Sequence, residues 1–265
     1  MAYAPLRKVK RAVCHINNLR QAIDAYLAEH PFKLVIKIKR RAGRIELVPK
    51  TYKPIPDDLS LIIGDAIHNL AAALDITLYG MARDRAPSPD KIMFPFPKRG
   101  ALDALEGAIN NGQVKFAGSN VADAIRALKP YDGGHPVLSG LHALDVRDKH
   151  HLLILTRYVP VLTGDDLGKV TKKFTGVEFV GPGRLHFQTP EDTPIFTYRK
   201  RFVLLGMGDS EEEADAQPVF NIAFGEGPSF YGRPVLSTLD EMTRAVEDTI
   251  DILVRAYRAP GNIFP

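Results

Sequence analysis

The chain has 265 residues, 45% of them hydrophobic and 25% charged, with a formal net charge of +4 at pH 7. These values are typical of a globular protein and exclude a disordered or fibrous one. Cys14 is the single cysteine, so neither an intramolecular disulfide nor a cysteine-based metal cluster can form. The first residues lack the apolar core of a signal peptide, and no run of about 18 apolar residues occurs, so we expect a cytoplasmic protein without a membrane partner.

The positive charge is concentrated at the N-terminal end. Residues 1–53 contain 13 Lys and Arg against 3 Asp and Glu, a local net charge of +10, so the remainder of the chain is net acidic. This asymmetry predicts an anionic partner for the N-terminal part of the chain.

The first two predicted elements differ in their hydrophobic period. Residues 6–29 carry apolar side chains at helical spacing, and Pro31 ends that helix. Residues 32–50 alternate with period two around a turn at Ala42 and Gly43, which predicts a β-hairpin with one apolar and one basic face.

Residues 57–83 form the longest helical pattern, and Asp57 or Asp58 can cap it. One stripe is apolar and must face a core: Leu59, Ile63, Ala66, Ile67, Leu70, Ala73, Leu74 and Leu78. The opposite side mixes small, apolar and titratable residues, which is typical of a helix lying between neighbours.

Residues 86–100 are rich in proline and aromatic residues and predict an irregular crossing, followed by short helices at 101–110 and 120–128. Residues 135–151 form a second helix with an unusual number of polar residues. We expect this helix to pack against the 57–83 helix, so that their polar ridges meet.

Beyond His151, several strand-like segments separated by Gly, Pro and Asp turns predict an antiparallel sheet over about 152–227. The acidic stretch 209–216 reads as a solvated loop, and 235–258 as the last helix. We therefore predict a single α+β domain over 1–265. Its helical bundle comprises 1–30, 57–151 and 233–258, with an N-terminal β-hairpin at 32–50 and an antiparallel β-sheet inserted before the C-terminal helix.

Two groups of polar residues are candidate sites. In the first, Asp65, His68 and Asp75 point roughly the same way beside Asn69, which suits either acid-base work by His68 or metal binding. The same residues, with His142, Asp145 and Asp148, would equally serve as a polar seam that fixes helix packing.

The second group lies at the end of the 135–151 helix. Arg147 and His151 are i,i+4 neighbours, and His150 adjoins them, so a phosphate-binding cation stands beside a candidate base. Histidines at a helix end also interact favourably with the last carbonyls, which is an alternative explanation.

The hairpin is a third candidate, because its outer face and turn are strongly basic. A charged face can serve solubility alone, but it also suits contact with phosphates without sequence readout. The expected contacts to RNA or DNA are Lys37, Lys39, Arg40, Arg41 and Arg44.

Two segments carry a resemblance to known families. GDAIHNLAAALD (64–75) and LHALDVRDKHHLLI (141–154) resemble the hallmark stretches of a widespread family of uncharacterised bacterial and phage proteins, although Ala71 and His151 stand where that family has arginine. The helical core with a nearby Arg and His is remotely similar to the HEPN superfamily, whose active members are metal-independent ribonucleases. That resemblance implies an RNA-cleaving function carried by an Arg and a His on one helix.

Three functions therefore stay open from the sequence. The sharpest is a nucleic-acid-directed protein that cleaves RNA without cofactor or metal, using His68, Arg147, His150 and His151. The second is a non-catalytic interaction or structural protein, and the third is a metal-dependent hydrolase. A homodimer is compatible with all three.

Overall fold

The computed structural model describes residues 3–97, 102–151, 156–163, 168, 184–186, 194, 196–199, 209–214, 219–225 and 230–265. It confirms the α+β class, with a helical bundle, an N-terminal hairpin and antiparallel sheet strands between the fifth helix and the C-terminal helix. The chain divides into two compact units, of which the first comprises residues 1–21, 57–155 and 224–265 and the second residues 22–56 and 156–223.

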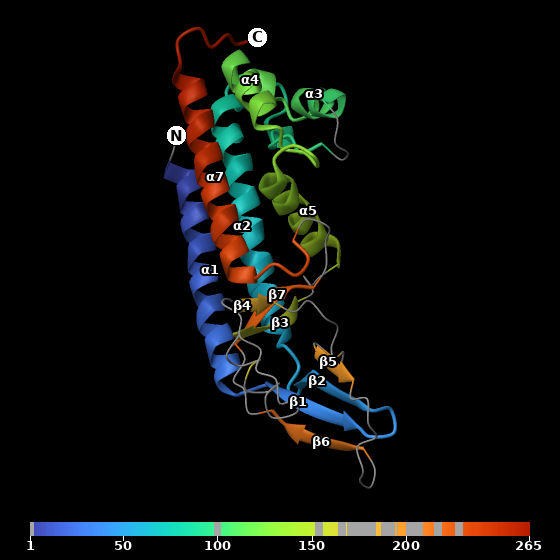
Figure 1. The fold of residues 1–265 in the computed structure, drawn as a ribbon. Helices are drawn as coiled ribbons and strands as arrows, with labels where there is room; N and C mark the ends of the chain where they lie inside the picture. Colours follow the sequence, from blue (N-terminus) through green and yellow to red (C-terminus); the bar gives the residue numbers. More distant parts are fainter. Residues whose placement is uncertain are drawn as a thin grey trace. The chain divides into compact units, whose positions relative to one another are not determined.

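Long helices build the first unit (Figure 1). These are α1 (Tyr3–Ala28, whose last turns belong to the second unit), α2 (Asp57–Ala82), α5 (Pro136–His151) and α7 (Val235–Arg258). Helix α2 packs against both α5 and α7, and α5 also contacts α7. The predicted apolar stripe of α2 is confirmed, since all eight of its residues are buried.

The composition of helix α2 suits both its N-terminus and its buried position. Asp57 and Asp58 lie in its first turn, where carboxylates interact favourably with the helix dipole. By length and apolar composition α2 could also cross a membrane, but 61% of its most apolar window is buried inside the protein, as expected for the core helix of a bundle.

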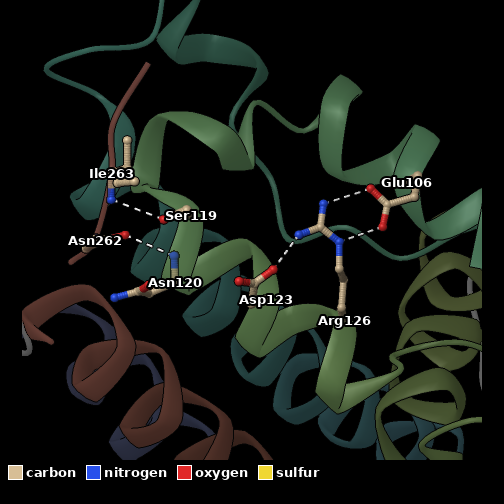
Figure 2. Close-up of polar contacts among 7 residues, drawn as sticks. All are labelled: Glu106, Ser119, Asn120, Asp123, Arg126, Asn262 and Ile263. Carbon is tan, nitrogen blue, oxygen red and sulfur yellow. Dashed lines mark hydrogen bonds and ion pairs between the residues drawn. The ribbon is translucent and has the colours of Figure 1, made fainter. Parts of the chain in front are cut away.

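Short elements close one end of this unit. They are η1 (Pro89–Lys91), α3 (Leu102–Asn111), η2 (Val114–Ala117) and α4 (Ser119–Leu128). Arg126 of α4 donates two hydrogen bonds to the carboxylate of Glu106 on α3, from Nε at 2.6 Å and from Nη2 at 2.8 Å. Its Nη1 donates to Asp123, as Figure 2 shows. These charge-assisted bonds lower the pKa of the Glu106 carboxyl.

The C-terminal segment caps helix α4. Gly118, the residue before α4, offers no side chain to the helix N-terminus. Instead the backbone N–H of Asn120 donates to Asn262 Oδ1 at 3.1 Å, and Ser119 exchanges hydrogen bonds with the backbone of Ile263 (Figure 2). Two orphan N–H donors of α4, those of Ser119 and Asn120, are therefore satisfied by residues more than a hundred positions away in the chain.

The second unit is organised around the predicted hairpin. Strand β1 (Phe32–Lys39) pairs antiparallel with β2 (Arg44–Thr51), and the four-stranded sheet has the order β5-β2-β1-β6, with β5 at Phe196–Arg199 and β6 at Ser210–Glu213. The predicted alternation holds for Leu34 and Ile36, which are buried, and for Lys33 and Lys37, which are partly exposed. It fails at Val35 and over residues 45–49 of β2, which are all buried, so the second face of the hairpin is partly covered as well. Lys33 lies directly opposite Lys50.

One element contradicts the sequence reading. Residues 210–213 were expected in a solvated loop, but they form strand β6, which pairs with residues 35–38 of β1. The prediction was wrong because a run of acidic residues has no alternating apolar pattern from which a strand can be predicted. These residues form a strand because they pair with the edge of β1 and contact lysines of the hairpin.

A three-stranded sheet completes the described strands of the second unit, in the order β4-β3-β7. Its strands are β3 (Thr156–Thr163), β4 (Arg184–His186) and β7 (Val219–Phe224). The strand expected within 168–181 lies outside the described residues, except for Gly168.

Candidate functional site

The polar ridges of α2 and α5 meet around a histidine and a buried carboxylate. His68 of α2 places Nδ1 3.1 Å from Oδ1 of Asp145 on α5, and Lys149 Nζ donates to the other oxygen of Asp145 at 2.6 Å. The Asp145 side chain is 6% exposed, whereas that of His68 is 51% exposed. An almost buried carboxylate therefore orients an imidazole that solvent can reach.

Asp148 joins the same cluster one turn from Asp145. Its carboxylate lies directly against the backbone of Gly64, and a Cβ at position 64 would collide with it. Burial is the main cause that raises the pKa of Asp148, and the neighbouring carboxylates of Asp145 and Asp65 raise it further. Gly64 is thus the small residue that lets α5 bring this carboxyl close to α2.

Helix α1 contributes two residues that the sequence reading did not include. His15 Nδ1 lies 3.8 Å from Asp65 Oδ2, and Lys8 Nζ donates to Asn69 Oδ1 at 3.3 Å. Asn69 in turn donates to the backbone carbonyl of Asp65. The amphipathic pattern of α1 located its buried face, but only the packing of α1 beside α2 shows which of its polar residues approach the ridge.

Asp75 and His142 both contact the irregular segment after α2. Asp75 Oδ1 accepts the backbone N–H of Phe94 at 2.7 Å, and the His142 ring stacks on Phe96 with a centroid separation of 4.5 Å. Burial raises the pKa of Asp75 and lowers that of His142, because it disfavours the charged form of each. Both residues anchor residues 92–97 onto the helices.

The helix-end group is only partly described. Arg147, His150 and His151 all belong to the last turns of α5, as expected, and Arg147 is partly exposed. The side chains of His150 and His151 lie outside the described residues, so their predicted catalytic role stays a prediction. Among the residues that the structure describes, no group of three His, Cys, Asp or Glu is placed to hold a metal ion.

The basic hairpin is largely paired within its own unit. Buried Glu46 lies 3.3 Å from Lys39 Nζ and 3.6 Å from Arg44 Nε, and Arg40 donates its backbone N–H to Asp209. Arg40 and Arg41 form the turn, where both are partly or fully exposed. Lys37 sits opposite Glu211 of β6. The five predicted nucleic-acid contacts therefore all lie on the two strands and the turn of the hairpin, and Glu46 and β6 offset part of their charge.

The chemical capacity of the α2–α5 cluster follows from these contacts. Because Asp145 engages Nδ1, we assign the proton of the neutral ring to Nδ1, which leaves Nε2 as the basic atom. Asp148, with its raised pKa, carries a proton over a wider pH range than an ordinary aspartate. Asp148 can therefore supply a proton and Nε2 of His68 can accept one, so the cluster holds both groups that general acid-base catalysis requires.

Comparison with protein-family models, with curated proteins and with solved structures finds no match to this chain. The resemblances of residues 64–75 and 141–154 to known families therefore remain expectations.

Proposed function

We propose that this protein is a metal-independent endoribonuclease in which His68, oriented by Asp145, is the general base. The observation that supports the proposal is the pairing of a nearly buried carboxylate with Nδ1 of a half-exposed histidine. In such an arrangement the carboxylate fixes the ring and stabilises the imidazolium that forms when Nε2 accepts a proton.

Nε2 of His68 removes the proton of an RNA 2′-hydroxyl, and the 2′-oxygen attacks the adjacent phosphorus. The bond from phosphorus to the 5′-oxygen breaks as Asp148, in its protonated form, transfers its proton to that oxygen. The products are a 2′,3′-cyclic phosphate and a free 5′-hydroxyl.

Positive charge for the phosphoryl oxygens comes from the same helix. Arg147 and Lys149 flank Asp148 in the sequence of α5, and Lys8 reaches the ridge from α1. Protonation of Asp148 removes one of the negative charges that would otherwise repel a phosphate. In this mechanism the guanidinium of Arg147 stabilises the negative charge that develops on the phosphoryl oxygens.

The experiment is an end-group analysis of cleaved RNA. A 5′-labelled oligoribonucleotide is incubated with purified protein in EDTA, and the products are tested for 2′,3′-cyclic phosphate ends. We expect cleavage by the wild type and by His135→Gln, a matched variant of a histidine at the other end of α5, and loss of cleavage in His68→Gln. Equal cleavage by all three proteins, or none by the wild type, contradicts the proposal.

A second function is favoured by one specific feature, the continuous chain of contacts from His68 through Asp145 to Lys149. Such a chain fixes the register between α2 and α5, as expected of a non-catalytic interaction or structural protein. On that account His68→Ala lowers the free energy of unfolding by about 1 to 2 kcal/mol. On that account neither the wild type nor His68→Ala cleaves RNA.

A further inference from the structure

An exposed aromatic ring lies between two lysines where the hairpin ends. Tyr52, 54% exposed, follows the last residue of β2, and its backbone N–H donates to Pro31 at 2.8 Å. Lys33 Nζ and Lys50 Nζ lie 5.7 and 5.9 Å from the centroid of its ring. Because Lys33 and Lys50 are cross-strand partners, the sheet itself sets this spacing.

Each of these lysines already holds a carboxylate. Lys33 Nζ donates to Glu213 at 2.9 Å, and Lys50 Nζ donates to Glu211 at 2.7 Å. Both carboxylates belong to β6, in which all four residues are exposed, so no buried side chain holds this strand in place. Exposed ion pairs contribute little to stability, so the successive phosphates of a polyanion can compete with such carboxylates for the two lysines.

We propose that Tyr52, Lys33 and Lys50 form a binding site for single-stranded nucleic acid. The carboxylates of Glu211 and Glu213 on β6 compete with the nucleic acid for the two lysines. One unpaired base stacks on Tyr52, and the two flanking phosphates take the positions of the Glu211 and Glu213 carboxylates. A ring flanked by cations suits a single strand, because each base offers a π-face while duplex bases are already stacked. The inference rests on the proposed function for its ligand class, RNA.

Binding is measured by fluorescence anisotropy with labelled U12 and dT12 at several salt concentrations, using His68→Ala so that the RNA stays intact. We expect Tyr52→Ala to weaken binding by roughly 5- to 100-fold. Tyr52→Phe keeps the ring and should retain affinity. The matched control is Tyr79→Ala, because Tyr79 is also an exposed tyrosine beside a cation, Arg83, but lies on α2.

The competitor role is tested by removing charge from β6. The double variant Glu211→Gln, Glu213→Gln should bind U12 several-fold more tightly than the parent, roughly as expected when two phosphate-binding lysines are released. Glu247→Gln with Asp251→Asn makes the same change of net charge on exposed positions of α7 and should leave affinity nearly unchanged. Lys33→Ala and Lys50→Ala should each reduce the salt dependence.

The outcomes separate this inference from the proposed function. If Tyr52→Ala and Tyr79→Ala bind alike, or if the β6 variant binds no more tightly than the α7 control, the site is refuted, even where the wild type cleaves RNA. If Tyr52→Ala weakens binding while the wild type does not cleave RNA, the site stands and the endoribonuclease proposal fails.

Discussion

Replacing Asp145 tests how the cluster is held together. Asp145→Ala removes the acceptor of two charge-assisted contacts, at 3.1 Å to His68 and 2.6 Å to Lys149. Hydrogen bonds to charged groups contribute about 1.5 to 3 kcal/mol each. Both partners are about half exposed and can recover water, so we expect a total loss of only about 1 to 3 kcal/mol in the free energy of unfolding.

The assay is urea denaturation of four proteins: wild type, His68→Ala, Asp145→Ala and the double variant. If the contact is direct, the double-mutant cycle should give a coupling of about 0.5 to 1.5 kcal/mol between the two positions. Asp145→Asn, which keeps the shape and one acceptor, should lose less stability than Asp145→Ala. A coupling near zero, with additive effects, would refute the pairing of α2 and α5 through these residues.

Three further predictions address the rest of the first unit. Burial raises the pKa of Asp148 above its ordinary 3.8, so the folded protein binds this proton more tightly than the unfolded chain does. The free energy of unfolding therefore falls as the pH rises from the pKa of the unfolded chain through the higher pKa of the folded protein. Asp148→Asn should therefore raise the melting temperature at pH 7, with the gain shrinking toward pH 4, and a constant gain at all pH values would contradict this reasoning. Asn262→Ala removes the acceptor for Asn120 and should cost about 1 to 2 kcal/mol in chemical denaturation, whereas an unchanged midpoint would show that the C-terminal segment does not stabilise α4. Gly118→Ala should be at least as destabilising in the same experiment, because Gly118 has φ +105° and its Cβ would collide with Asn262; a neutral result would refute the close approach.

Much of this architecture could be predicted because its elements have strong periodic patterns. The stripe of α2 identified its buried face, and alternation along 32–50 gave the hairpin and its basic side. The meeting of the polar ridges of α2 and α5 was also expected, since both helices have apolar faces elsewhere, but the pairing of His68 with Asp145 in particular was not predicted.

The remaining features depend on tertiary contacts that leave no local pattern. Strand β6 is a strand because it pairs with β1, and its acidic sequence alone is typical of a loop. His15 and Lys8 reach the ridge only through the packing of α1. The His142 ring stacks on Phe96, a residue of an irregular segment whose path no periodicity predicts.

The central claim is that Asp145 holds His68 with Nδ1 protonated and Nε2 free to act as base. Long-range nitrogen–proton correlation NMR of the imidazole at a pH where the ring is neutral reports the tautomer directly. The structure predicts the Nδ1–H form for His68 in the wild type and a shift toward the Nε2–H form in Asp145→Ala. An Nε2–H tautomer in the wild type, unchanged by Asp145→Ala, would contradict the account.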